Sequence, residues 1–213
     1  AGGSSPSAQP KTPAPTSPSA VPSPTASTTA SATATATDGA LAGWSLEEKV
    51  GQLMMVGVDA TSPKDSSTEA IDTHHVGNIF IAGRTTAGSQ ATQKVIASFT
   101  GKVGPGTTHN TPMLVSTDQE GGEVQVLSGS GFSEIPSAMD QSAQSRDQLV
   151  AAARTWGKEL ADVGVNMNLA PVVDLVDIDR PTTNEPIGRW GREYRHDAAT
   201  VSSKAGAFAE GMQ

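Results

Sequence analysis

The chain of 213 residues carries a formal net charge of −8 and contains no cysteine. The acidic balance excludes a protein that binds nucleic acid through a basic surface, so no nucleic-acid partner is expected. The lack of cysteine excludes disulfides, thiolate metal ligands and a thiol nucleophile. No apolar run reaches the roughly 18 residues of a membrane-spanning helix, so no transmembrane segment is expected.

The first part of the chain has the composition of a spacer. Residues 1–37 consist of Ala, Gly, Ser, Pro, Thr, Gln, Val and a single Lys, and they hold seven of the 14 prolines. Such a sequence buries too little apolar surface to offset its ordering entropy, so we predict a disordered Pro/Ser/Thr/Ala-rich linker over residues 1–40. A spacer that begins at Ala1 without a signal core is typical of a processed exported protein, which predicts an extracellular or cell-surface location.

Residues 41–213 are long enough to fold as one domain with its own core. Ser45 and Glu48 form a capping-box pattern that predicts a short helix, with Leu46, Val50 and Leu53 on one face. The next elements predicted from apolar patterning are a strand at 54–58, a helix at 69–75, a strand at 76–83 and a helix at 89–100.

The clearest helix is predicted later in the chain. Its apolar residues recur at steps of three and four over 145–163, namely Leu149, Ala153, Trp156, Leu160 and Val163. The other elements predicted in this half are a strand at 113–117, a loop at 118–131, a strand at 165–173, a charged loop at 175–196 and a last helix at 197–213.

Apolar strands that alternate with amphipathic helices are typical of a parallel sheet covered by helices. Four strands are predicted here, whereas a closed eight-stranded barrel needs roughly 250 residues. We therefore predict the α/β class and a TIM-type (β/α) barrel, present only as its N-terminal half or slightly more. A small doubly wound sheet is the alternative, although the Gly-rich first turn of a nucleotide site is missing.

Two carboxylates follow the third predicted strand. Met113–Val115 is an apolar run, and Asp118 and Glu120 come shortly after it, followed by Gly121 and Gly122. This pattern predicts a buried strand that ends by presenting acids on a tight loop, where barrel enzymes build their chemistry. The two acids alone are consistent with an acid/base pair or with a polar turn that caps the next element.

Several motifs together resemble glycoside hydrolase family 3, most closely its single-domain β-N-acetylhexosaminidase branch. They occur in the family's order: L-E-E-K-V-G-Q-L-M-M-V-G (46–57), G-N-I-F-I-A-G (77–83), P-M-L-V-S-T-D-Q-E-G-G-E-V-Q (112–125), I-P-S-A-M (135–139), N-L-A-P-V-V-D (168–174) and I-G with R-E-Y-R-H-D (187–197).

The resemblance implies a (β/α) barrel that hydrolyses terminal β-linked N-acetylglucosamine in cell-wall-type glycans by a retaining mechanism, without a cofactor. It implies an aspartate nucleophile and a histidine acid/base, both expected beyond Gln213, so that the chain alone is expected to be inactive. It is also compatible with a lipid anchor upstream of Ala1.

The resemblance assigns two substrate-binding residues and no catalytic or metal-binding residue. Asp118 matches the aspartate that accepts hydrogen bonds from sugar hydroxyls, and Arg192 matches an arginine that also holds the sugar. Outside the family, Arg192 is explained equally well by a surface ion pair. Glu120 is expected to be structural.

This chain departs from the family pattern at two positions, where Glu123 and Val126 replace the usual arginines. The departure leaves the precise substrate open. A β-glucosidase is the alternative within the family. A non-catalytic glycan-binding module on a surface stalk, or a remnant of a gene, is the alternative outside it.

Overall fold

The computed structural model describes residues 39, 41–177 and 179–213. The chain divides into two units, Ala1–Gly39 and Ala40–Gln213, and the description below concerns the second unit. The predicted linker over residues 1–40 lies outside the described residues except for Gly39, and it stays a prediction.

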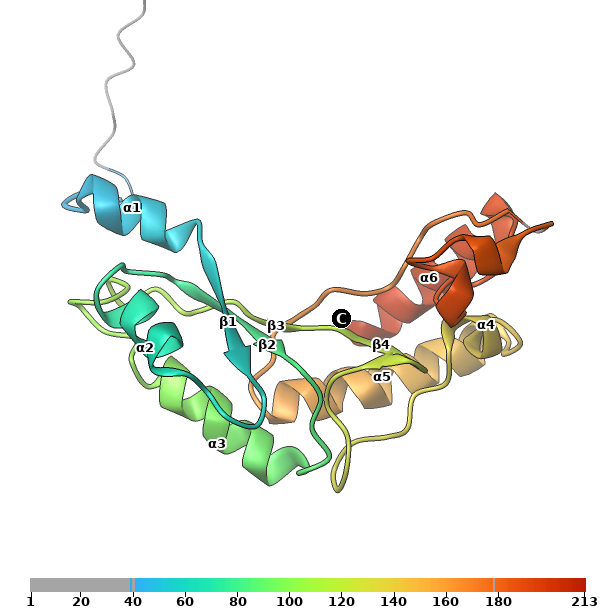
Figure 1. The fold of residues 1–213 in the computed structure, drawn as a ribbon, viewed down its shortest axis with the longest axis horizontal. Helices are drawn as coiled ribbons and strands as arrows, with labels where there is room; N and C mark the ends of the chain where they lie inside the picture. Colours follow the sequence, from blue (N-terminus) through green and yellow to red (C-terminus); the bar gives the residue numbers. More distant parts are fainter. Residues whose placement is uncertain (1–38, 40, 178) are drawn as a thin grey trace, which may run out of the picture. The chain divides into compact units, whose positions relative to one another are not determined.

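The second unit alternates helices and strands along the chain (Figure 1). Its elements are α1 (Leu46–Gln52), β1 (Met55–Asp59), α2 (Asp65–Asp72), β2 (Asn78–Ala82), α3 (Ser89–Thr100), β3 (Val115–Thr117), β4 (Gln119–Gly121), β5 (Val124–Gln125), α4 (Ala138–Gln141), α5 (Arg146–Asp162), β6 (Met167–Asn168), the 3₁₀ turns η1 (Pro181–Thr183) and η2 (Gly188–Trp190), and α6 (Ala198–Met212).

The main sheet has the strand order β1-β2-β3-β6, and every neighbouring pair is parallel. This order follows the chain without a reversal, whereas a doubly wound sheet reverses its strand order at a switch point. The sheet is not closed among the described residues. The prediction of a partial (β/α) barrel is therefore confirmed, and the doubly wound alternative is wrong.

Helices α2, α3 and α5 lie along one face of this sheet (Figure 1). Val58, Ile79 and Ile81 point to that face, where the core also contains Ile71, Ile96, Phe99 and Leu160. On the opposite face Met55, Leu114 and Met167 keep 38%, 47% and 38% of their surface exposed. A face that no described helix covers is what the interior side of a barrel sheet requires.

Helices α5 and α6 form a second packed layer. All five residues of the apolar stripe predicted for 145–163 are buried, which confirms the helix and its inward face. The rings of Trp156 and Phe208 lie 6.1 Å apart between the two helices. Gly211 permits the close approach, because a Cβ there would come within 2.4 Å of the Val150 carbonyl oxygen.

Three predicted elements differ from the structure. The strand expected at 165–173 is only β6, because Pro171 has no N–H to donate to a sheet. The loop expected at 118–131 contains the antiparallel pair β4–β5, whose polar sequence gave no strand signal. The helix expected at 69–75 is α2, which begins at Asp65 after Pro63 and uses the Ser67 hydroxyl to bind the Gly57 carbonyl oxygen.

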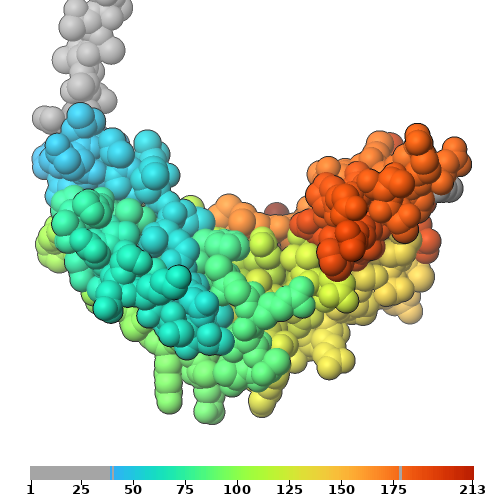
Figure 2. Space-filling model, in the orientation of Figure 1, coloured from blue at the N-terminus to red at the C-terminus, as the bar shows by residue number. Residues whose placement is uncertain are grey.

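Helix α1 begins at the predicted capping box of Ser45 and Glu48. Its apolar residues Leu46, Val50 and Leu53 do share a face, but they are 72%, 49% and 85% exposed. In the space-filling view this blue segment stands at the surface (Figure 2). Among the described residues, no helix combines the length and apolar character needed to cross a membrane.

Candidate functional site

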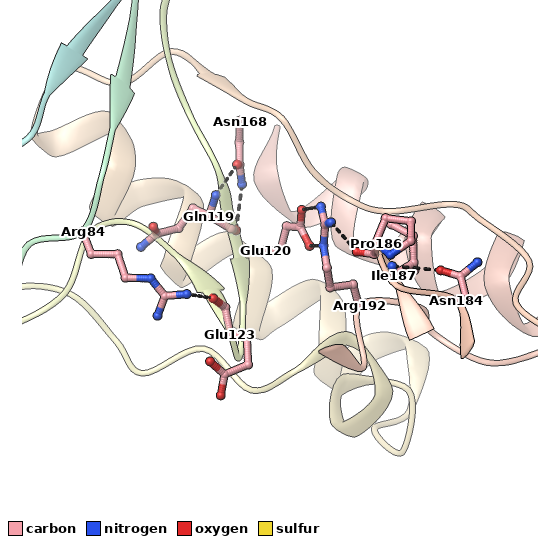
Figure 3. A network of polar contacts seen from close by, with 9 residues as sticks. All are labelled: Arg84, Gln119, Glu120, Glu123, Asn168, Asn184, Pro186, Ile187 and Arg192. Carbon is pink, nitrogen blue, oxygen red and sulfur yellow. Dashed lines mark hydrogen bonds and ion pairs between the residues drawn. The ribbon is translucent and has the colours of Figure 1, made fainter. Parts of the chain in front are cut away.

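Polar residues from separate parts of the chain meet beyond the carboxyl ends of the parallel strands (Figure 3). Arg84 follows β2, Asp118 follows β3, and Arg192 lies on the long loop between β6 and α6. In (β/α) barrels this end of the sheet carries the active site. The fold therefore assembles a candidate site from residues far apart in sequence.

Gln119 fixes the backbone on which the two acids lie. Its side-chain amide donates to the Leu127 carbonyl oxygen at 2.8 Å and accepts from the Leu127 N–H at 3.0 Å. Its own backbone exchanges two further hydrogen bonds with the Asn168 side-chain amide. Because neighbouring residues of an extended segment point to opposite sides, a buried Gln119 turns Asp118 and Glu120 toward the other side.

The turn after these acids requires glycine. Gly121 has φ of +104°, and a Cβ there would lie 2.3 Å from the Pro136 carbonyl oxygen. Gly122 also has a positive φ, of +55°. The tight, glycine-dependent loop predicted from the sequence is therefore present, and it fixes the direction of the chain just after Glu120.

Glu120 and Arg192 form a two-bond ion pair. Arg192 Nε donates to Glu120 Oε2 at 2.8 Å, and Nη2 donates to Oε1 at 2.5 Å. The Glu120 side chain is 7% exposed and the Arg192 side chain 26%. The hydrogen bond to Glu120, aided by its charge, raises the pKa of Arg192. Such a fork-to-carboxylate contact fixes orientation as well as charge.

The Arg192 guanidinium is also tied to its own loop, because Nη1 donates to the Pro186 carbonyl oxygen at 2.8 Å. A guanidinium carries five N–H donors, so this contact and the Glu120 pair leave two for a ligand. The loop is ordered by Asn184, whose side-chain oxygen accepts from the Ile187 N–H at 2.9 Å. Arg192 is thus a positioned donor rather than a free surface residue.

Asp118 is the carboxylate of the site that can still accept hydrogen bonds from a ligand. It is half-buried, and its carboxylate has no hydrogen-bond partner among the described residues, whereas its backbone carbonyl accepts from the Val126 N–H. Burial raises the pKa of Asp118, the nearby Glu120 carboxylate raises it further, and Arg192 acts in the opposite direction. An acceptor kept without an internal partner suits a ligand that brings hydroxyl donors.

The geometry argues against an acid/base pair of Asp118 and Glu120. Glu120 already gives both carboxylate oxygens to Arg192, so it is not free to attack or to activate water. Two of the four histidines contact residues outside this pair of acids. His109 pairs with Glu48 at 2.8 Å, and His196 lies 3.1 Å from the Val176 carbonyl oxygen. In the described part of the chain, no group of three or more His, Cys, Asp and Glu could hold a metal ion.

The structure brings the two predicted binding residues together through a third, Glu120, which sequence reasoning treated only as structural. The sequence signal for Glu120 was the alternation of side chains along an extended segment, which places residues 118 and 120 on the same side. The two residues that depart from the family pattern, Val126 and Glu123, differ in their exposure to solvent. Val126 is 7% exposed within the core, and Glu123 is an exposed residue whose backbone carbonyl accepts from Arg84 Nη2.

The model of the glycosyl hydrolase family 3 N-terminal domain matches residues 45–213. The chain belongs to this family. Among curated proteins, the beta-hexosaminidase LpqI of Mycobacterium tuberculosis is 33% identical to this chain over 173 residues. The match covers 79% of this chain and 40% of that protein. A beta-hexosaminidase of Idiomarina loihiensis is 35% identical over 106 residues, covering 47% of this chain and 30% of that protein.

Two solved structures extend the comparison. A beta-N-acetylhexosaminidase from Beutenbergia cavernae shows a TM-score of 0.77 and 51% identity, covering 79% of this chain and 50% of that one. A family 3 beta-N-acetylglucosaminidase from Paenibacillus shows a TM-score of 0.69 and 32% identity, covering 79% of this chain and 31% of that one. The chain thus spans half or less of the length of the relatives that it matches.

Proposed function

We propose that residues 41–213 form the sugar-holding part of a glycoside hydrolase that releases terminal β-linked N-acetylglucosamine from cell-wall-type glycans. Asp118 accepts hydrogen bonds from two neighbouring hydroxyls of the terminal ring. Arg192, held by Glu120, donates its remaining N–H groups to the same ring. One observation carries the proposal: the Asp118 carboxylate, which has no partner among the described residues, lies beside a guanidinium that a buried acid already holds in position.

The division of roles follows from charge. An ionised carboxylate accepts two hydroxyl hydrogen bonds, and each bond is strengthened by the charge. An arginine offers N–H donors in a fixed plane. Hydrogen bonds to Glu120 and to the Pro186 carbonyl oxygen already restrict the Arg192 side chain before a ligand binds, so binding costs little further conformational entropy. Binding a pyranose therefore requires little rearrangement of either side chain, which favours affinity.

The choice of N-acetylglucosamine over glucose rests on the relatives. The relatives and solved structures described above carry the names beta-hexosaminidase, beta-N-acetylhexosaminidase or beta-N-acetylglucosaminidase. We further propose a retaining mechanism with a covalent glycosyl intermediate, as the family resemblance implies. The same resemblance, with the predicted linker, supports an extracellular or cell-surface location.

None of the four histidines of the chain lies in the sequence context that the family resemblance gives to the acid/base histidine. We therefore propose that these 213 residues do not turn over substrate by themselves. The nucleophile and the acid/base are assigned to polypeptide beyond residue 213. Release of 4-nitrophenol by the 213-residue chain, dependent on Asp118, would contradict this part of the proposal.

The function is tested by incubating the full-length protein with the 4-nitrophenyl β-glycosides of N-acetylglucosamine and of glucose. We expect faster release from the N-acetylglucosaminide, with the β-anomer of the sugar formed first in the proton NMR spectrum. Faster release from the glucoside would favour the β-glucosidase alternative. No release from either, with sugar binding retained, would favour a non-catalytic glycan-binding module.

A further inference from the structure

A buried amide lies behind the Glu120–Arg192 ion pair. It belongs to Gln141, the last residue of α4, whose side chain is completely buried. The Nε2 atom of Gln141 donates to the Glu120 carbonyl oxygen at 2.9 Å and to the Pro136 carbonyl oxygen at 2.7 Å. The Oε1 atom accepts from the Tyr194 hydroxyl at 2.9 Å. Because carbonyl oxygens only accept, they fix which way the amide faces. A buried bridge therefore connects β4 to the loop that carries Arg192.

Tyr194 forms the other end of this bridge, inside the core. Its side chain is 1% exposed and belongs to the buried cluster that also contains Leu149, Val201 and Phe208. Burial raises the pKa of Tyr194, and the charge of Glu120 raises it further. The hydroxyl therefore keeps its proton at neutral pH and can donate to Gln141. Both the position and the protonation state of this donor are fixed by the core.

The bridge and the ion pair meet at the same residue. The carboxylate of Glu120 binds Arg192, whereas the carbonyl oxygen of Glu120 binds Gln141. Arg192 and Tyr194 lie two positions apart on one loop, so this loop is held to β4 at two points. A single contact would let the loop pivot about Glu120, and the second contact prevents that rotation. The position of the Arg192 guanidinium relative to Asp118 thus depends on both contacts.

We propose that Tyr194 and Gln141 are positioning residues of the sugar site, and that they act on the bound ring only through Arg192. The inference rests on the proposed function. Both side chains are too deeply buried to touch a sugar themselves. Without the bridge, the Glu120–Arg192 pair would still form, but its guanidinium would move over a wider range. A sugar would then bind at the cost of restricting that motion, so the bridge adds affinity without a direct contact.

The proposal is tested by a double-mutant cycle on the affinity of the full-length protein for N-acetylglucosamine, measured by calorimetric titration. Tyr194→Phe keeps the ring and removes the hydroxyl, so we expect it to weaken binding about fivefold. Arg192→Lys removes the fork through which the bridge acts. Adding Tyr194→Phe to Arg192→Lys should therefore weaken binding by less than about twofold more.

A second variant and a control accompany the cycle. Gln141→Met removes the amide from a side chain of similar length and should weaken binding as Tyr194→Phe does. Tyr194→Phe, the milder change, decides the test if Gln141→Met does not fold, as judged by circular dichroism. Ser67→Ala is the matched control, because the buried Ser67 hydroxyl donates to the Gly57 carbonyl oxygen at 2.7 Å, between α2 and β1. It also loses one buried hydroxyl hydrogen bond, yet its affinity should be unchanged.

An unchanged affinity in Tyr194→Phe would overturn the inference. An equal loss in the wild-type and Arg192→Lys backgrounds would overturn it too, since the hydroxyl would then act independently of the guanidinium. An equal loss in Ser67→Ala would assign the effect to general destabilisation, with the same consequence. In each of these cases the wild type still binds the sugar and the proposed function stands. If the wild type does not bind N-acetylglucosamine, the proposed function fails and this inference fails with it.

Discussion

Arg192 and Glu120 are 72 positions apart in the chain, yet they meet through two hydrogen bonds of 2.8 and 2.5 Å. The pair joins β4 to the long loop between β6 and α6. It therefore fixes Arg192 relative to Asp118, which lies two residues before Glu120. The pair is partly buried, so its loss should affect both the stability of the fold and the shape of the site.

Replacing Glu120 by Gln tests this coupling. The variant keeps the side-chain shape but loses the charge and one acceptor, so we expect the free energy of unfolding to fall by roughly 1.5–3 kcal/mol. Urea denaturation of the full-length protein measures the change. The matched control is Glu185→Gln, which breaks the exposed pair with Arg189 and should cost less than about 0.5 kcal/mol. Equal costs for the two variants would contradict a structural role of the Glu120–Arg192 pair.

Replacing Arg192 by Lys keeps the positive charge but removes the planar fork. A lysine cannot bind both oxygens of Glu120 and the Pro186 carbonyl oxygen together, so sugar affinity should fall about tenfold or more. Calorimetric titration with N-acetylglucosamine measures this loss. An affinity equal to that of the wild type would show that Arg192 contributes charge alone.

The raised pKa of Asp118 predicts opposite effects on stability and on binding. In the folded protein the group holds its proton at pH values above its ordinary pKa of 3.8, where the unfolded chain has lost it. Stability is therefore lost as the pH rises from about 3.8 through the raised pKa. Asp118→Asn should raise the free energy of unfolding at pH 7, by less than about 1 kcal/mol because water screens the exposed part of the group.

This stability gain should disappear as the pH falls below 3.8, where Asp118 is protonated in both the folded and the unfolded wild type. Sugar binding by the wild type should weaken over the same range, because the protonated carboxyl loses acceptor capacity. Thermal melts and titrations at several pH values measure both trends. A variant that is less stable than the wild type at pH 7 would contradict the prediction.

Gly121→Ala tests the turn behind the two acids. A Cβ at this position would lie 2.3 Å from the Pro136 carbonyl oxygen, and its φ of +104° is unfavourable for alanine. We expect a loss of at least about 2 kcal/mol in the free energy of unfolding. Gly106→Ala is the control, because no atom lies within 4 Å of a Cβ built there. If both variants unfold at the same denaturant concentration, the turn does not require glycine.

The helices were the most predictable part of the fold. A repeated apolar step of three and four identified α5 and its buried face, and the structure adds a capping box at Ser145. Alternation of strands and helices was enough to predict a parallel sheet. The length of β6 and the β4–β5 pair were missed because they depend on Pro171 and on long-range amide contacts from Gln119 and Asn168, which no local pattern reveals.

The candidate site was only partly predictable for the same reason. The resemblance predicted Asp118 and Arg192 as binding residues, whereas the contact of Glu120 with Arg192 depends on the loop after β6 lying beside β4 (Figure 3).

The central claim is that Asp118 holds the terminal sugar. Calorimetric titration of the full-length protein with N-acetylglucosamine at pH 7, for the wild type and for Asp118→Asn, tests it most directly. Loss of charged hydrogen bonds to two hydroxyls should weaken binding roughly tenfold to a hundredfold in a variant that remains folded. An Asp118→Asn protein that binds N-acetylglucosamine as tightly as the wild type would contradict the claim.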